Sequence, residues 1–198
     1  GMTSQVPLLA ERFFRDQMKG ADIKTGKNLL AFEIGKHYIL QSIQEDLKLI
    51  QQGDSLKIIS VEEKFEALIP LSGLPFQVKI RGKIDRVDQL NGITRIIDYK
   101  TGSQITASSL KIKDWSSLTN DYDKYHKCFQ ILCYAYLWRA NHPNTSSVEG
   151  GVFALKNISL GLIRLGIPSE DGKTYSHSID RAVLDQFEQI LSELVLTI

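Results

Sequence analysis

The chain contains 198 residues, of which 42% are hydrophobic and 24% are charged, and this length and composition suit one domain with a sizeable core. Its formal net charge of +1 neither indicates nor excludes a nucleic-acid partner, so any basic surface must be local. A membrane span is not expected, because no run approaches the roughly 20 apolar residues that a span needs, and the N-terminus lacks the layout of a signal peptide.

Two helices are expected at the start of the chain. Apolar residues recur every three or four positions over residues 7–19 and again over residues 27–52, which is the period of an amphipathic helix. Gly20 and Gly26 bracket the break between them.

Three strand-like segments follow, at residues 56–71, 74–88 and 92–101. Turns are marked by "SGLP" and "QLNG", and the second predicts a hairpin because Asn and Gly tolerate a positive φ angle. The three segments therefore predict an antiparallel meander.

The rest of the chain mixes helices and strands. Residues 103–121 are rich in Ser and Thr, and we expect a mobile loop there, beside the strand ends. A helix at 121–141 is predicted to end before Pro143, because the proline ring cannot continue the helical ladder. Strands are expected at 147–157 and 160–168, and a closing helix at 179–198. This order predicts an α/β sandwich with a mixed sheet.

The stretch "GKIDRVDQLNGITRIIDYKTG" places acidic residues in two apolar strands. Strand alternation puts Asp98 and Lys100 on one face, and Ile97 and Tyr99 on the other. Asp85 lies across the "QLNG" turn, so the carboxylates of Asp85 and Asp98 could converge at one strand end.

Two carboxylates that lie close together repel each other unless a cation or a proton separates them. Mg²⁺ meets this need because it binds one or two carboxylates and takes further ligands from water and substrate phosphate. Lys100 would then position or deprotonate the attacking water, or neutralise charge on the phosphate. Alternatively, Asp85 and Arg86 form surface ion pairs and Lys100 is a solvated strand end.

The pair "GKIDRVD" and "IIDYKTG" resembles the core of the PD-(D/E)XK nuclease superfamily, and specifically the RecB-like nuclease domains at the C-termini of RecB and AddB helicase-nuclease subunits. The resemblance implies a restriction-endonuclease-like three-layer sandwich, in which helices flank a mixed central β-sheet with an antiparallel meander. It also implies a Mg²⁺- or Mn²⁺-dependent deoxyribonuclease, an exonuclease module in recombination and repair that acts on DNA with a helicase subunit or domain as its partner. Residues 1–198 would then be a single nuclease domain, excised from a longer helicase-nuclease polypeptide.

The resemblance also implies the site residues. The metal ligands would be His37, Asp85, Asp98 and the carbonyl of Tyr99, with Lys100, Asp98 and Asp85 as the catalytic group. Ile34 and Leu40 predict that His37 lies on the inward face of its helix, where it could equally be a core histidine with a satisfied hydrogen bond. Glu33, one turn earlier, is a weaker candidate for the same face.

Three further residues could support the site. "QILCY" matches a Gln-x-x-x-Tyr motif of the family, so Gln130 and Tyr134 could orient Lys100 or contact DNA. Otherwise Gln130 is a surface residue and Tyr134 a core residue. Glu63 matches a first-strand glutamate of some relatives; alternation places it inward with Phe65, although it could instead face solvent.

The two cysteines do not match the metal sites of some relatives. Those relatives bind an iron-sulfur cluster through four cysteines, whereas Cys128 and Cys133 lie five apart on one helix without companions. We therefore expect no iron-sulfur cluster and two core thiols. The absence of a disulfide framework is typical of a reducing compartment, so we expect a cytoplasmic protein without a membrane anchor.

Basic residues near the expected site could receive a phosphate backbone, although surface solubility would explain them equally well. They are Lys79, Arg81, Lys83, Arg86, Arg95, Lys111, Lys113, Lys124 and Lys127. Two alternative functions remain open at this point: a catalytically silent DNA-binding or scaffolding domain of a recombination complex, and a stand-alone exonuclease or defence-type nuclease of the same superfamily.

Overall fold

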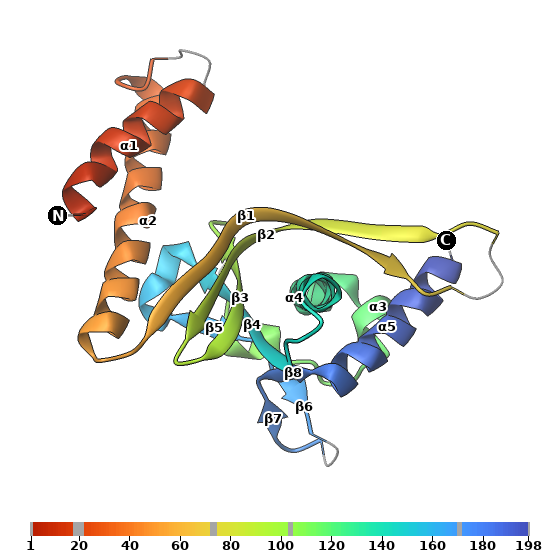
Figure 1. Ribbon diagram of the computed structural model, residues 1–198. Coiled ribbons are helices and arrows are strands. Elements are labelled where there is room, and N and C mark those ends of the chain that lie inside the picture. The colour runs from red at the N-terminus through yellow and green to blue at the C-terminus, as the bar shows by residue number, and fades with distance from the viewer. Residues whose placement is uncertain (1, 18–21, 72–74, 103–104, 170–171, 198) are drawn as a thin grey trace.

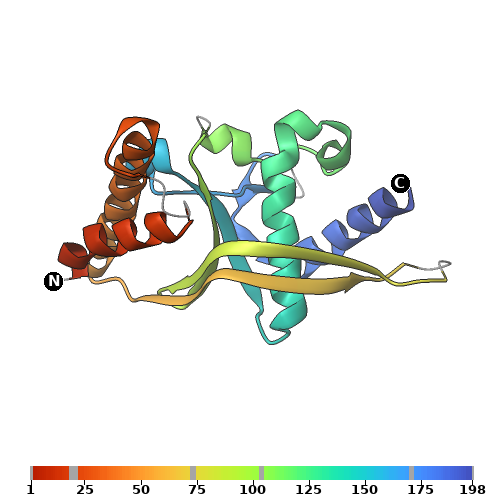
Figure 2. The same cartoon turned by 90° about the horizontal axis from the view of Figure 1, so that it is seen from above.

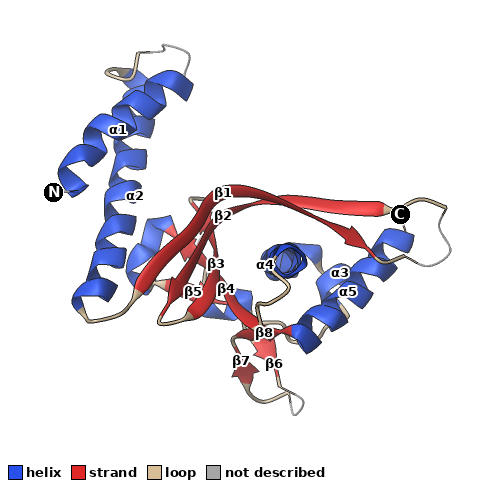
Figure 3. Cartoon of the chain, in the orientation of Figure 1, coloured by secondary structure: helices blue, strands red, loops and turns tan. Residues whose placement is uncertain are grey.

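The computed structural model describes residues 2–17, 22–71, 75–102, 105–169 and 172–197. Helices lie on both faces of a central sheet, which gives three layers (Figures 1 and 3). The helices and 3₁₀ turns are α1 Met2–Gln17, α2 Gly26–Gln51, η1 Ala107–Leu110, α3 Ser117–Asn120, α4 Tyr122–Asn141, η2 Leu155–Leu160 and α5 Arg181–Leu196. The strands are β1 Leu56–Ile69, β2 Val78–Leu90, β3 Ile93–Lys100, β4 Ser147–Ala154, β5 Leu162–Arg164, β6 Ile167–Pro168, β7 Tyr175–Ser176 and β8 Ser178–Asp180.

The sheet is mixed, as the sequence predicts. Its strand order is β1-β2-β3-β4-β5, and β8 also pairs with β4. The β1-β2-β3 meander is antiparallel, whereas β3 and β4 run parallel. This confirms the expected α/β architecture, which is consistent with a restriction-endonuclease-like fold. The expected strand at 160–168 is divided between β5 and β6, and β7 and β8 were not predicted.

The hairpin between β2 and β3 has the backbone that its residues favour. Asn91 and Gly92 have φ angles of 51° and 87°. Both values lie in the left-handed region, which Asn and Gly enter more easily than other residues. The predicted "QLNG" hairpin is therefore confirmed, whereas residues 72–74 of the "SGLP" turn lie outside the described residues.

The two neighbours of β2 pair with it over different lengths. β1 pairs with β2 from Val78 to Leu90, but β3 pairs with β2 only from Arg86 to Leu90. The rest of β2 leaves the sheet with β1 as a two-stranded ribbon, and Figure 2 shows this ribbon passing over α4. Asp85 therefore lies where β2 separates from β3.

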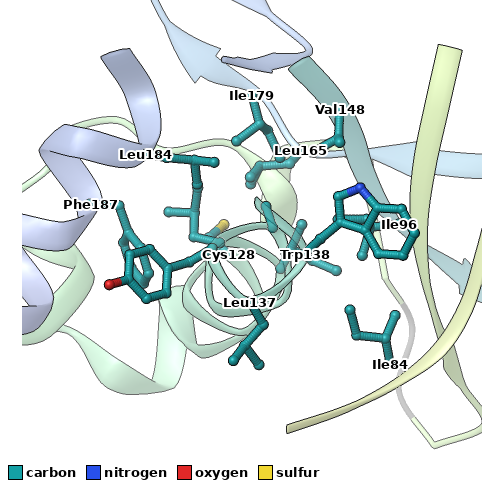
Figure 4. Close-up of a cluster of buried hydrophobic side chains, with 14 of the residues drawn as sticks. Ile84, Ile96, Cys128, Leu137, Trp138, Val148, Leu165, Ile179, Leu184 and Phe187 are labelled. Atoms are coloured by element: carbon teal, nitrogen blue, oxygen red, sulfur yellow. The ribbon is translucent and has the colours of Figure 1, made fainter. Parts of the chain in front are cut away.

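The main core surrounds α4 (Figure 4). Strand residues such as Ile84 and Ile96 pack on one side of this helix, and Phe187 of α5 packs on the other. Cys128 is buried in this core and Cys133 packs against it, and burial raises the pKa of both thiols to about 12. The prediction of a core thiol is confirmed for Cys128, whereas Cys133 is partly buried at the edge of the core.

The segment after β3 is not the mobile loop that we expected. In its described part, residues 105–121, it forms η1 and α3, and it buries four apolar side chains in the main core. A bridge between Lys111 and Gly166 also joins it to the segment between β5 and β6. The many Ser and Thr residues are typical of a loop, so the sequence did not predict this packing. The buried residues are Ile105, Leu110, Ile112 and Leu118.

Helices α1 and α2 form a hairpin at one end of the molecule (Figure 1). A small cluster joins them, in which the rings of Phe14 and Phe32 lie 5.4 Å apart edge to face. α1 begins at Met2, before the expected start at residue 7, and its expected end at residue 19 lies outside the described residues. In the described parts of the chain, no helix is both long and apolar enough to cross a membrane.

A buried ionic cluster holds α2 against the meander. Asp88 of β2 is fully buried and binds Arg95 of β3 through two hydrogen bonds of 2.7 and 2.9 Å. Its carboxylate also lies 2.6 Å from Arg86, which forms two hydrogen bonds to Asp46 of α2, of 2.8 and 3.0 Å. The suggestion that Arg86 and Arg95 receive DNA phosphates is therefore wrong, because both guanidinium groups are buried in ion pairs.

Replacing Asp88 should destabilise the protein strongly. Asp88→Ala leaves the buried guanidinium of Arg95 without its carboxylate and removes one of the two carboxylate partners of Arg86. Loss of one partner from a buried ion pair costs about 3–5 kcal/mol. Urea unfolding monitored by circular dichroism measures this loss.

The matched control is Glu66→Ala, which removes the exposed ion pair with Lys79. Exposed ion pairs contribute little to stability because water and salt screen them, so this variant should unfold close to the unsubstituted protein. Equal effects of the two substitutions would contradict a structural role for the buried cluster.

Candidate active site

Asp98 carries a carboxylate that β3 buries within the fold. Only 2% of the residue is exposed, and the Lys100 ammonium lies 3.2 Å from Oδ1 and 2.9 Å from Oδ2. The contact with Oδ1 has hydrogen-bond geometry, whereas Oδ2 is buried without a hydrogen-bond partner among the described residues. Burial raises the pKa of Asp98, Lys100 lowers it in part, and the charge of Asp85 raises it further. The site thus holds a negative charge that Lys100 alone does not neutralise.

Asp85 meets Asp98 at the separation of β2 from β3. The register pairs Arg86 with Ile97, so one further step places Asp85 opposite Asp98. Oδ2 of Asp85 accepts a hydrogen bond of 2.8 Å from the backbone N–H of Tyr99. The carboxylate of Asp85 therefore binds the backbone of β3 next to Asp98, on the edge of β3 that β2 leaves unpaired. The charge of Asp85 contributes to the raised pKa of Asp98, so the two carboxylates lie near enough to interact, as expected.

Gln130 and Tyr134 of α4 extend the site beyond the strands. Lys100 donates a 2.9 Å hydrogen bond to Oε1 of Gln130, and Nε2 of Gln130 donates a 2.8 Å hydrogen bond to the hydroxyl of Tyr134. An ammonium has only donors, so the amide oxygen of Gln130 must face Lys100. Gln130 is therefore not a solvated helix-surface residue, and it holds Lys100 from the side opposite Asp98. Burial raises the pKa of Tyr134.

Gly82, the first residue of "GKIDRVD", allows α4 to approach β2 closely. A β-carbon at this position would lie 3.0 Å from Cδ1 of Leu137 and 3.4 Å from the ring of Tyr134. A side chain here would crowd the side chains of Leu137 and Tyr134, which would have to shift to make room. This glycine therefore helps to place Gln130 and Tyr134 beside Lys100.

Tyr99 faces the opposite side of the sheet, as alternation predicts. Its ring stacks on Phe153 with centroids 5.9 Å apart, and its hydroxyl accepts a 3.3 Å hydrogen bond from Arg86. Arg86 and Asp46 therefore support the strand behind the two acids, a role that the sequence analysis missed. The available signal for Arg86 was an arginine between the two aspartates of "DRVD". Asp46 gave no signal, because it lies on a distant helix.

His37 does not occupy the inward face that we predicted. Its side chain is exposed, and Ile34, which was used to define the inward face, is 43% exposed. The prediction of the inward face is wrong because α2 contacts the fold through another side, which includes Asp46. Glu33 is also exposed and pairs with Lys36 at 2.7 Å. Metal binding by His37 stays a prediction.

Glu63 is likewise exposed, so its predicted inward position is wrong. Phe65, two residues later, is buried against Trp138 of α4, with ring centroids 5.6 Å apart. Next to Glu63, Glu62 has a φ of 53°, which interrupts the extended backbone of β1. Strand alternation alone could not show at which residue of β1 the packing against α4 ends. A supporting role for Glu63 stays a prediction.

The donor set at Asp85 and Asp98 fits a hard divalent cation. Both side chains offer carboxylate oxygens, and the buried Oδ2 of Asp98 lacks a hydrogen bond among the described residues. In the described part of the chain, no three His, Cys, Asp or Glu side chains are close enough to hold one ion. A two-carboxylate site suits Mg²⁺, which retains several waters and takes ligands from phosphate.

Comparison with protein families agrees with this geometry. The model for the PD-(D/E)XK nuclease superfamily matches residues 6–198. A search of curated proteins gave no match. The matched region contains the whole array from Asp85 to Tyr134, and it covers almost the entire chain. The protein therefore belongs to the PD-(D/E)XK nuclease superfamily.

Proposed function

We propose that this protein is a metal-dependent deoxyribonuclease that hydrolyses phosphodiester bonds with Mg²⁺ or Mn²⁺. One observation carries the proposal: Asp98, Lys100, Gln130 and Tyr134 form a continuous chain of contacts beside Asp85. A structural role alone does not account for a buried carboxylate with a raised pKa next to a second acid. Membership of the nuclease superfamily supports phosphodiester chemistry.

Asp85 and Asp98 would hold the metal ion, together with the carbonyl of Tyr99. A divalent ion bound there would stabilise negative charge on the phosphate and lower the pKa of a bound water. His37 is a further proposed ligand that would require α2 to move, because its side chain is exposed in this structure. A nitrogen ligand would favour Mn²⁺ over Mg²⁺, because nitrogen ligands suit transition metals better than they suit Mg²⁺.

Lys100 would act on the reacting phosphate or on the attacking water. Asp98 and Gln130 hold its amino group from two sides, so little reorganisation is needed when the substrate binds. The hydroxyl of Tyr134 accepts from Gln130, and its own proton can therefore be donated to a phosphate oxygen. These contacts orient Lys100 and leave its remaining donor for the substrate.

We further propose that the chain is a single nuclease domain of the AddB or RecB type, an exonuclease that works with a helicase subunit or domain in recombination and repair. The motifs "GKIDRVD" and "IIDYKTG" support this proposal. A silent scaffolding domain has no physical need for the Asp98–Lys100–Gln130 array, which favours the catalytic proposal over that alternative.

Cleavage of end-labelled DNA tests the function. The protein should cut single- or double-stranded DNA with Mn²⁺ or Mg²⁺, and EDTA should stop the reaction. Lys100→Ala should lower the rate by about 100-fold or more, because it removes a positioned charge from the reacting phosphate. The product ladder distinguishes exonuclease from endonuclease action.

Lys57→Ala is the matched control, since Lys57 is an exposed lysine of β1. It should cut DNA at the unsubstituted rate. Full metal-dependent cleavage by Lys100→Ala would show that the active site lies elsewhere.

Gln130→Leu tests the positioning of Lys100. The substitution removes the acceptor of the 2.9 Å hydrogen bond from Lys100 but none of the proposed metal ligands. We expect kcat to fall about 10- to 100-fold, the usual effect of removing a partner that orients a site residue, with Mn²⁺ affinity unchanged by calorimetry. Gln44→Leu on the exposed face of α2 is the control. A normal kcat in Gln130→Leu would rule out the positioning role.

Asp98→Asn should stabilise the metal-free protein at pH 7. Because burial raises the pKa of Asp98, the folded protein binds this proton more tightly than the unfolded chain, and stability falls as the pH rises through the two pKa values. The neutral amide avoids this loss. Its advantage in urea unfolding with EDTA should therefore be largest at neutral pH and disappear below the ordinary pKa of 3.8. Destabilisation at pH 7 would contradict the unfavourable charge.

A further inference from the structure

Four residues spaced four apart form a stripe along α4: Tyr122, His126, Gln130 and Tyr134. Residues at this spacing are neighbours on a helix surface. The second half of the stripe faces the active site, because Gln130 binds Lys100 and Tyr134. Figure 2 shows α4 along its length. The first half of the stripe lies between Gln130 and the N-terminal end of this helix. Gln130 lies about 12 Å along the axis from Tyr122.

Tyr122 and His126 form an aromatic platform, in which Tyr122 is exposed and His126 is half-buried. Their ring centroids are 5.4 Å apart at an interplanar angle of 33°, and 71% of Tyr122 is exposed. Nδ1 of His126 lies 3.2 Å from the carbonyl oxygen of Tyr122 and 3.0 Å from that of Asp123, which fixes the imidazole on the helix. The exposed face of Tyr122 can therefore stack on an unpaired base without first being ordered.

Lys127 adds a positive charge beside this platform. Its Nζ lies 3.2 Å from Nε2 of His126. Carbonyl oxygens can only accept, so Nδ1 is assigned as the donor to them and Nε2 as the acceptor for this ammonium. In the described part of the chain Lys127 forms no ion pair with a carboxylate, although Asp123 lies one turn earlier. Its charge is therefore not neutralised by an acidic partner, and it can attract a phosphate.

We propose that Tyr122, His126 and Lys127 bind single-stranded DNA next to the phosphate that is cut. A base would stack on Tyr122, the neighbouring phosphate would meet Lys127, and the strand would then follow the stripe to Gln130 and Lys100. This inference rests on the proposed nuclease function and specifies its substrate. A base within a duplex cannot offer its face to Tyr122 because it is already stacked on both sides, so the surface selects an unpaired strand.

Fluorescence anisotropy with a labelled oligo-dT strand, in EDTA to prevent cleavage, measures this binding in the full chain. Tyr122→Ala should weaken single-strand binding at least about fivefold, and Tyr122→Trp should retain it, because stacking requires only an aromatic face. Lys127→Gln should reduce the slope of log affinity against log salt by about 0.7, the contribution of one phosphate contact on a single strand. A blunt hairpin duplex with the same label should bind more weakly and respond less to Tyr122→Ala.

The two controls remove the same kinds of side chain, a lysine and an aromatic ring, at positions outside the proposed surface. Lys57→Gln removes an exposed lysine of β1, and Phe76→Ala removes an aromatic ring that is 62% exposed in the loop before β2. Both should bind oligo-dT like the unsubstituted protein. Equal binding by the Tyr122→Ala, Lys127→Gln and control proteins would overturn the inference, as would preferential binding of the duplex.

Parallel cleavage reactions in Mn²⁺ separate this inference from the proposed function. Metal-dependent cleavage that is lost in Lys100→Ala, together with unaltered binding by Tyr122→Ala and Lys127→Gln, would overturn only the single-strand surface. Single-strand binding that needs Tyr122 and Lys127, without cleavage in Mn²⁺ or in Mg²⁺, would support the surface and contradict the nuclease.

Discussion

The buried carboxylate of Asp98 determines how the rest of this site is arranged. A negative charge that is withdrawn from water needs cationic or hydrogen-bonding partners, and the structure provides one ammonium group, from Lys100. Gln130 holds that ammonium from the other side, while Asp85 brings a second negative charge close to the first. The remaining imbalance is the physical reason to place a divalent cation between the two acids.

The fold creates this arrangement by separating two strands. β2 pairs with β3 only from Arg86 onward, so the edge of β3 that carries Asp98 and Lys100 is left without a strand partner on that side. The backbone N–H of Tyr99 binds Asp85 there. Behind the sheet, the Arg86–Asp46 pair fixes α2 to the same strands, and in front α4 contributes both core packing and Gln130.

Much of the site could be predicted from the sequence because it depends on local periodicity. Alternation along β3 separates Asp98 from Tyr99, the "QLNG" turn brings Asp85 across, and a spacing of four places Tyr134 beside Gln130. What could not be predicted depends on packing between distant elements. Helical period cannot show which side of α2 meets the sheet, so His37 was placed inward although it is exposed. The pairing of Arg86 with Asp46 spans 40 positions, and the burial of Ile112 occurs in a segment that resembles a loop.

The most direct test of the two-carboxylate site is anomalous diffraction from crystals soaked in Mn²⁺. An ion bound by carboxylate oxygens of Asp85 and Asp98, with Lys100 beside it, is the expected result, and the same map would show whether α2 brings His37 to the metal. Mn²⁺ bound only at other positions, with the Asp98–Lys100 pair unchanged, would contradict a metal-dependent active site at this strand edge.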